Sequence, residues 1–328
     1  MKKHIALLAG GNSSERSIAL QSAAQVYEAL DKTRYDVWLI DVFGRTFTFR
    51  DEKGGCWPLD LNDFSLTVEG VRTVFDYAYI MIHGTPGEDG HLQGYLEMMG
   101  VPFSSPDMVS SVITFDKVSC KRAVEGTGIN LAKGILVGGG EWIEPSKIVA
   151  ELGLPLFVKP NASGSSCGVT KVHTEAELPD AVAKAFEESS EVLIEECITG
   201  REFACGVLIT SNREYLLPVT EIVAINEFFD YEAKYSAGKS DEITPADLPE
   251  EVVEQLHTMT AAAYRACRCK GLARVDFIVD ANNRPYMIEI NTIPGMSAGS
   301  IVPKQLRTAG INLTDFLTEI IEDTQCNR

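Results

Sequence analysis

The stretch of sequence that decides the fold is ARVDFIVDANNRPYMIEINTIPGM, residues 273–296. Its alternation of polar and apolar residues predicts two short strands, residues 274–279 and 286–291. The two asparagines between them are typical of a two-residue type I′ loop, so we expect the strands to form a hairpin. Pro285 cannot donate a hydrogen bond to the ladder, so a bulge is the alternative to a regular register.

Regular pairing would bring two carboxylates together on one face of this hairpin. Asp276 would lie directly opposite Glu289. Arg274 would then lie opposite Asn291. Two opposed carboxylates destabilise a sheet unless a positive charge lies between them. An Asp, a Glu and an Asn carbonyl without His or Cys form an all-oxygen set of ligands, which suits Mg²⁺, and the arginine would suit a phosphate. The alternative is a solvated hairpin face that binds nothing.

Composition narrows the class of protein. A chain of 328 residues is long enough for two or three domains, and 45% hydrophobic residues indicate a globular protein. Acidic residues outnumber basic ones by 47 to 29, giving a net charge of −18. This charge argues against nucleic acid or an anionic membrane as a partner. A nucleotide substrate remains compatible with it, because a few local cations and a metal are enough to bind the phosphates.

Neither a targeting segment nor a zinc site is predicted. The apolar run after Met1 is too short for a signal peptide, and no apolar run approaches the roughly 20 residues of a membrane span. Of the eight cysteines, only Cys267 and Cys269 lie close together, and their spacing is a poor zinc or redox signature. We therefore expect a cytoplasmic protein with free thiols.

The first hundred residues are typical of an α/β domain. Strands are predicted at residues 5–9, 37–42 and 77–82, and helices at residues 15–30 and 92–99. Strands that alternate with helices in this way indicate a parallel sheet with right-handed crossovers.

Farther along the chain, strands are expected at residues 202–210 and 216–222. The polar segment at residues 226–245 is expected to be an irregular lid or functional loop.

A loop rich in Gly and Ser follows Lys159, with the sequence PNASGSSCG. Gly164 and Gly168 allow a close approach of the backbone to a ligand, and the serines add donors, so the loop resembles a phosphate cradle. It is not a Walker A loop, because the lysine precedes the glycines. An ordinary hairpin loop is the alternative.

Two further motifs follow strands of the N-terminal region. GGNSSE ends in Glu15 at the start of a helix, which suits anion binding, although the carboxylate alone would also favour the helix dipole. A nicotinamide-dependent dehydrogenase is disfavoured, because the G-x-G-x-x-G pattern is absent. HGTPGEDG begins with His83 at a strand end, where open α/β sheets bind ligands, but a lone histidine is more often structural.

Taken together, these motifs resemble the D-alanine–D-alanine ligases of the ATP-grasp superfamily. The matching stretches span residues 7 to 303 and are LLAGGNSSERS, HGTPGEDGHLQGYLEMMGVPF, FDKVSCK, LPLFVKPNASGSSCGV, VLIEE, FFDYEAKY, LARVDFIVD and IEINTIPGMSAGSIVP. The resemblance implies an α/β fold with an N-terminal parallel α/β domain (residues 1–103) followed by a two-subdomain ATP-grasp fold. Its central subdomain would span residues 104–196, and its C-terminal subdomain, with the lid and the hairpin, residues 197–328.

The resemblance also implies which residues bind ATP and metal. Those for ATP are Lys117 and Lys159 at the phosphates, Ser165 and Ser166 in the loop over them, Glu195 and Ile198 at adenine, Glu202 at ribose, and Lys234 in the lid at the γ-phosphate. Asp276, Glu289 and Asn291 match the ligands of two Mg²⁺ ions, with Mn²⁺ as an alternative.

For the amino acids, Glu15 would anchor the ammonium of the first D-alanine. Ser165 and Tyr235 would be linked to it by hydrogen bonds, and His83 would lie near the same molecule.

Arg274 and the backbone N–H of Gly295 would stabilise an oxyanion. Ser300 and Ile301 would hold the carboxylate of the second substrate.

The implied reaction joins two D-alanines through an acyl phosphate made from ATP. A D-alanine–D-serine ligase, a D-alanine–D-lactate ligase and a silent nucleotide-binding protein of the same fold are the alternatives. An intact DYEAKY segment favours dipeptide formation. Two residues depart from the family pattern, Glu196 where a lysine is common and Gly299 where a polar residue is common. The resemblance further implies a homodimer.

Overall fold

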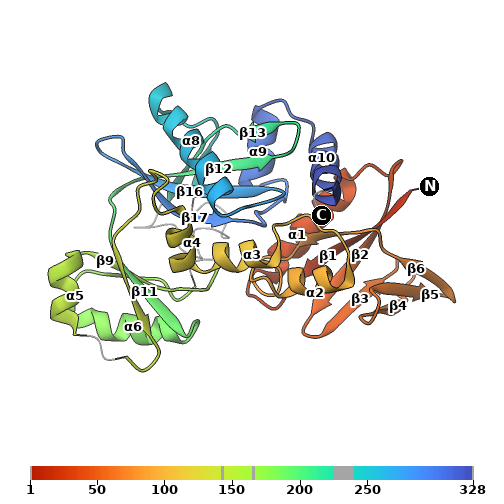
Figure 1. Ribbon diagram of the computed structural model, residues 1–328, viewed down its shortest axis with the longest axis horizontal. Coiled ribbons are helices and arrows are strands. Elements are labelled where there is room, and N and C mark those ends of the chain that lie inside the picture. The colour runs from red at the N-terminus through yellow and green to blue at the C-terminus, as the bar shows by residue number, and fades with distance from the viewer. Residues whose placement is uncertain (1, 142–143, 165–166, 225–239, 327–328) are drawn as a thin grey trace.

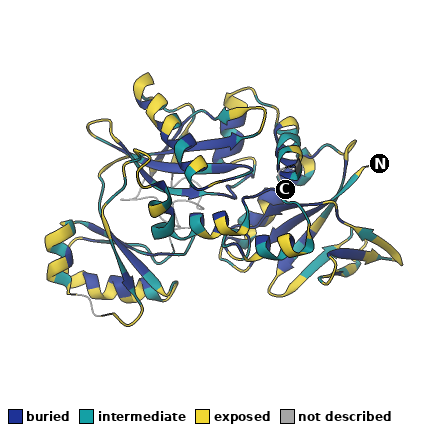
Figure 2. Ribbon diagram, viewed as in Figure 1, coloured by how far each residue is buried: buried dark blue, intermediate teal, exposed yellow. Residues whose placement is uncertain are grey.

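Three β-sheets organise the chain (Figure 1). The computed structural model describes residues 2–141, 144–164, 167–224 and 240–326. Figure 2 shows that strands in each of these sheets are largely buried and that the helices expose one face to solvent. None of the helices in the described ranges is long and apolar enough to cross a membrane.

The first sheet has seven strands in the order β6-β5-β4-β3-β2-β1-β7. Strand β1 pairs in parallel with both β2 and β7, and its residues from Ile5 to Ala9 are fully buried, which explains their continuous apolar run. The elements of this region are β1 (Lys3–Gly10), α1 (Arg16–Ala29), β2 (Tyr35–Phe43), β3 (Thr46–Arg50), β4 (Cys56–Asp60), β5 (Ser65–Val68), β6 (Val71–Val74), β7 (Tyr77–Met81) and α2 (His91–Met99).

The parallel arrangement expected for this region is confirmed around β1, but the sheet as a whole is mixed. Strands β3 to β6 form an antiparallel meander that extends it. These strands are four or five residues long, too short for their alternation to stand out in the sequence.

The second sheet is antiparallel and has the order β10-β9-β11-β8. Its elements are β8 (Gly134–Gly138), α5 (Pro145–Leu152), β9 (Leu156–Pro160), β10 (Thr170–Val172), α6 (Leu178–Phe186) and β11 (Glu191–Glu196), with a short 3₁₀ helix at Glu175–Glu177. Helices α3 (Met108–Phe115) and α4 (Lys117–Val124) lead into it from the first sheet. Figure 1 shows this unit at the lower left, on the far side of the molecule from the first sheet.

The third sheet is antiparallel, with the order β15-β14-β12-β16-β17 and β13 paired to β12. Its elements are β12 (Gly200–Ile209), β13 (Glu214–Leu216), β14 (Thr220–Ala224), β15 (Ser240–Ile243), α8 (Glu250–Ala266), β16 (Ala273–Asp280), β17 (Pro285–Asn291), α9 (Ile301–Thr308) and α10 (Leu313–Cys326). The strand expected at residues 216–222 is divided between β13 and β14. Part of the segment expected to be irregular, residues 226–245, forms strand β15, because the residues of β15 pair with β14.

The C-terminal helix α10 returns to the first sheet. Phe316 and Ile320 of α10 belong to the same buried apolar cluster as β1, and the Tyr77 hydroxyl lies 2.5 Å from Thr324 Oγ1. Figure 1 shows α10 beside the first sheet. The two ends of the chain are therefore packed together, while the second sheet has an apolar core of its own.

The β16–β17 hairpin has the expected register at the site but not the expected loop. Asp276 lies opposite Glu289. The loop has three residues rather than two, because the Asp280 N–H donates to the Arg284 carbonyl and Asn283 adopts a left-handed conformation, with φ of 60°. The two-residue type I′ loop was therefore a wrong prediction.

A bulge at Ile288 corrects the resulting offset. Phe277 pairs with Met287, whereas the preceding residue of β16 pairs with Glu289, so Ile288 is the extra residue of β17. The extra loop residue and the bulge cancel, and the two carboxylates still face each other.

Candidate active site

Two pockets meet at this hairpin. The first lies between the second and third sheets and is lined by residues that include Lys117, Lys159 and Asp276. The second is lined by residues at the start of α1 and after β7, including Glu15, and by residues of the third sheet and the segment that follows it, including Ser300. Gly164 and Glu289 line both pockets.

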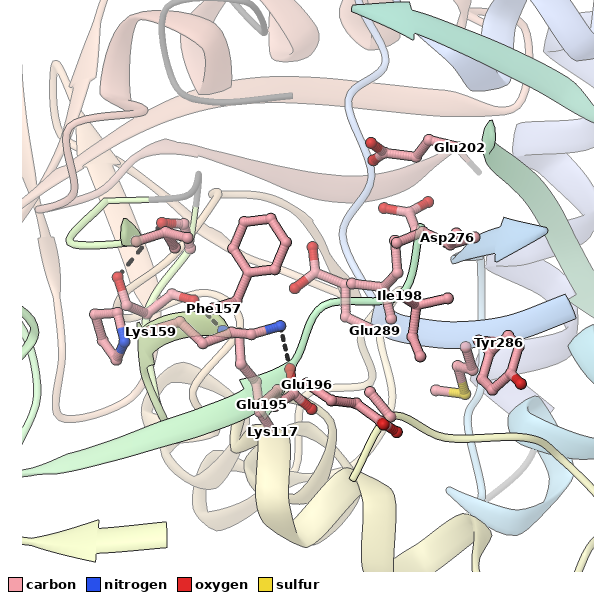
Figure 3. Close-up of a pocket in the computed structure, with 18 of the residues that line it drawn as sticks. Lys117, Phe157, Lys159, Glu195, Glu196, Ile198, Glu202, Asp276, Tyr286 and Glu289 are labelled. Carbon is pink, nitrogen blue, oxygen red and sulfur yellow. Dashed lines mark hydrogen bonds and ion pairs between the residues drawn. The ribbon is translucent and has the colours of Figure 1, made fainter. Parts of the chain in front are cut away.

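One wall of the first pocket is basic. Lys117 begins α4, and its Nζ donates to the Ser163 carbonyl over 2.8 Å. Lys159, on β9, forms an ion pair with the buried carboxylate of Glu195 (Figure 3). The same carboxylate is also paired with Lys121. Lys121 lies four residues after Lys117, one turn along the same helix.

Burial lowers the pKa of both buried lysines, Lys159 and Lys121. Desolvation, with the neighbouring charges of Lys121 and Lys117, lowers the pKa of Lys159 to about 7, and the carboxylates of Glu289 and Glu202 oppose this shift. Desolvation also lowers the pKa of Lys121 to about 8. The wall is therefore a set of poorly hydrated cations, which an anionic ligand would stabilise in their charged form.

The hairpin supplies the acidic side of the same pocket. Figure 3 shows Glu202, Asp276 and Glu289 on one side, across from Phe157 and Lys159. Asp276 is 5% exposed and accepts two hydrogen bonds from Arg274, at 2.7 and 2.6 Å. The Arg274 guanidinium is therefore the cation that offsets the opposed carboxylates.

The donor set of this hairpin fits a hard divalent cation. Asn291 Nδ2 lies 3.0 Å from Asp276 Oδ2, so the amide is next to both carboxylate positions. Among the described residues, no group of three His, Cys, Asp or Glu side chains is arranged to hold a metal. The candidate ligands are thus two carboxylates and an amide, an all-oxygen set suited to Mg²⁺.

An apolar slot completes the first pocket. Phe157, Ile198, Tyr286 and Met287 line it beside the hairpin and β9. A flat aromatic base would find apolar contact there. The side chain of Glu195, expected near adenine, lines the same pocket but is 4% exposed and is paired with Lys121 and Lys159.

Four glutamates are among the described residues that line the second pocket, and two of them, Glu15 and Glu88, come from the N-terminal region. Glu15, directly before α1, is 8% exposed, and a Cβ on Gly164 would lie 2.9 Å from its Oε2, so the Gly/Ser loop approaches this carboxylate closely. Glu88 accepts a hydrogen bond of 2.6 Å from the Gly84 N–H. Burial, reinforced by Glu15, raises the pKa of Glu88 to about 8.

The far side of the second pocket is formed after β17. Gly295 lies against Ser300, whose Oγ would be 2.9 Å from a Cβ at that glycine. Ser300 precedes α9, which begins at Ile301, and all three residues line the pocket with His83.

The structure therefore brings most of the predicted site residues to two adjoining pockets. Ser165, Ser166, Lys234 and Tyr235 lie outside the described residues. Sequence reasoning missed Lys121, Phe157 and Glu88 as lining or supporting residues. The one available signal was the spacing of Lys121 from Lys117.

Comparisons with known proteins agree over the whole chain. Residues 4–106 match the family model described as D-ala D-ala ligase N-terminus, and residues 124–322 match D-ala D-ala ligase C-terminus. A D-alanine–D-alanine ligase of Parabacteroides distasonis is 46% identical over 328 residues, covering 100% of this chain and 99% of the relative.

Two solved structures are also similar. The VanG D-Ala:D-Ser ligase of Enterococcus faecalis has a TM-score of 0.87 at 30% identity, covering 99% of this chain and 100% of that one. A D-alanine–D-alanine ligase of Bacillus anthracis complexed with ATP has a TM-score of 0.78 at 33% identity, covering 99% and 97%. The expected ATP-grasp fold is thereby confirmed, and the chain belongs to the D-alanine–D-alanine ligase family.

Proposed function

We propose that this protein uses ATP to join two D-alanine molecules into D-alanyl-D-alanine for peptidoglycan precursors. The observation that carries the proposal is the meeting of the two pockets at Glu289. One pocket has cations and an apolar slot suited to a nucleotide, and the other has a carboxylate suited to an ammonium. A carboxylate held in the second pocket would face a terminal phosphate held in the first.

In this mechanism the first D-alanine is bound through its ammonium by Glu15. Its carboxylate attacks the γ-phosphate, the bond from the γ-phosphorus to the β,γ-bridging oxygen breaks, and an acyl phosphate and ADP result, while Lys117 and Lys159 bind the phosphates. Mg²⁺ held by Asp276, Glu289 and Asn291 would offset the charge of the transferring phosphoryl group.

The amine of the second D-alanine then attacks the acyl phosphate. Arg274 leaves Asp276 for the developing oxyanion, where the Gly295 N–H also donates, and inorganic phosphate departs. Ser300 and Ile301 orient the second substrate through its carboxylate.

The remaining assignments rest on the family pattern. Ser166 and Lys234 would contact ATP phosphates, and Ser165 and Tyr235 would support Glu15. We further propose that Ile198 and the backbone of Glu195 bind adenine and that Glu202 binds ribose.

We also propose a cytoplasmic homodimer. The cysteines among the described residues are free thiols, which fits a reducing compartment where ATP is available. Sedimentation of the purified protein tests the dimer.

A D-alanine–D-serine ligase is the second candidate, since the VanG ligase shares the fold. Gly299, which lines the second pocket, supports this candidate. A Cβ there would meet nothing within 4 Å, so the pocket has room beside Gly299 for the larger side chain of serine.

Product analysis with ATP and Mg²⁺ tests both candidates. D-alanine alone is expected to give D-alanyl-D-alanine, ADP and phosphate, and L-alanine is the control that should give none. Greater use of D-serine than of D-alanine at equal concentrations would favour the second candidate. ATP binding without any amino-acid-dependent phosphate release would refute ligase activity.

A further inference from the structure

A buried serine of α1 holds the turn that carries Gly295. Ser22 is fully buried, and its Oγ accepts a hydrogen bond of 3.1 Å from the Met296 N–H. The same Oγ lies 3.3 Å from His83 Nε2. On the other side of the imidazole, Nδ1 lies 2.9 Å from the Ile293 carbonyl.

The chemistry of the partners decides how the protons are arranged. A carbonyl oxygen can only accept, so His83 Nδ1 carries the proton that is donated to Ile293. His83 Nε2 is then an acceptor, and Ser22 donates its hydroxyl proton to it while accepting from Met296. Burial lowers the pKa of His83, which favours this neutral form. Both ring nitrogens and the serine oxygen are thus satisfied by protein groups.

The hydrogen bonds to the Met296 N–H and to the Ile293 carbonyl lie on either side of Gly295 in the chain. Ile293 lies two residues before it and Met296 one residue after it, and both side chains are in the main apolar cluster. Gly295 itself is half-buried between buried neighbours and lines the second pocket. Gly295 therefore lines the pocket between two fixed points of the turn, together with Ile293 and Pro294.

Helix α1 connects this clamp to the first substrate. Glu15 directly precedes α1, and Ser22 lies seven residues later, two turns along the same face and about 10 Å away. One rigid helix therefore carries both the candidate ammonium anchor and the support of the candidate oxyanion donor.

We propose that Ser22 is a positioning residue for the ligase reaction, acting with His83 to hold the Gly295 N–H at a fixed distance from Glu15. This inference rests on the proposed function. In this proposal His83 holds the turn in place. Its two ring nitrogens bind protein groups, so His83 influences the first amino acid only through the turn.

The test compares Ser22→Ala with Ser111→Ala. Ser111, on α3, is an equally buried serine that donates to the Pro106 carbonyl over 3.3 Å and lines neither pocket, so its variant controls for the loss of one buried hydroxyl. Removing an oxyanion donor outright costs about 10² to 10³ in kcat, and Ser22→Ala only loosens the donor. We expect kcat to fall roughly tenfold with the KM for ATP within about twofold, while Ser111→Ala changes neither.

Amide hydrogen exchange of residues 292–296 gives a readout that does not depend on turnover. We expect it to be roughly tenfold faster in Ser22→Ala and unchanged in Ser111→Ala. Unchanged exchange would overturn the clamp. Faster exchange with wild-type kcat would overturn the role in catalysis. If the unmodified protein makes no dipeptide, the proposed function fails by itself, and exchange still decides whether Ser22 clamps the turn.

Discussion

At the scale of single residues, the basic wall predicts how ATP binding depends on pH. Lys159 has a pKa lowered to about 7, mainly by burial, so its charged form predominates below that pH and is lost as the pH rises through it. Bound phosphate favours the charged form, so affinity for ATP should weaken above about pH 7. Calorimetric titration of ATP from pH 6 to 9 measures this, with Lys159→Arg as the control that stays charged throughout. Equal slopes for both proteins would contradict the assignment.

Glu289 lines both pockets and is a candidate ligand of Mg²⁺. Glu289→Gln keeps the size of the side chain but removes a charged ligand, so we expect kcat to fall by roughly 100-fold or more and the Mg²⁺ requirement to rise. Glu214→Gln is the matched control, because Glu214 belongs to the same sheet, pairs with Arg265 and lines neither pocket. Magnesium titration of ADP release measures both. Near-normal activity in Glu289→Gln would refute the metal role.

At the scale of elements, the N-terminus of α4, the helix that carries Lys117 and Lys121, is connected to the start of the Gly/Ser loop. The Asp116 carboxylate caps α4 by accepting from the Ser119 N–H at 2.7 Å, and it also accepts from Asn161 Nδ2 at 2.6 Å. Asp107 caps α3 in the same way, through the Ser110 N–H at 2.8 Å. The two aspartates are therefore a matched pair of caps, of which only one reaches the loop after β9.

Replacing each cap separates stability from binding. Asp116→Ala and Asp107→Ala should each lower the free energy of unfolding by about 1 kcal/mol, since each removes an N-cap. Only Asp116→Ala should also raise the KM for ATP, by several-fold, because it removes one of the hydrogen bonds that hold Asn161 at the start of the loop. Thermal melts and ATP kinetics of the two variants decide. An equal KM in both would show that α4 is placed by other contacts.

The hairpin shows how far the sequence could predict an element. The pairing of Asp276 with Glu289 was predicted from a two-residue loop, and it is correct because the bulge at Ile288 cancels the extra loop residue. The loop was wrong, since Asn283 in a left-handed conformation suits a three-residue loop as well as a type I′ turn. Nothing in the residue types alone places the bulge at Ile288. Lys121 was not predicted as part of the site, because one lysine on a helix is typical of a solvated surface.

At the scale of the whole molecule, the composition of the apolar cores could not be inferred from local patterns. The first core joins β1 to α10, which are about 300 residues apart in the chain, and only tertiary packing brings them together. The extent of the units, residues 1–103, 104–196 and 197–328, stays a prediction. The family motifs that fall on described residues did predict which parts of the chain meet, because Glu15, Lys117, Lys159 and Asp276 all line one of the two pockets.

The separate core of the second sheet predicts a local opening of the molecule. Its buried apolar residues all come from this unit, so β8 to β11 can lose their packing while the first core stays intact. ATP contacts Lys159 in this unit and the hairpin of the third sheet, so it should oppose the opening. At 100 times its Kd, the nucleotide adds about 2.7 kcal/mol to the stability of the bound form.

Hydrogen exchange with and without a non-hydrolysable ATP analogue and Mg²⁺ measures this. We expect exchange in β9 and β11 to slow by up to about 100-fold, while the peptide covering β1 changes little. Equal slowing in β1 would mean that the chain opens as one unit, and no slowing in β9 would place the nucleotide elsewhere.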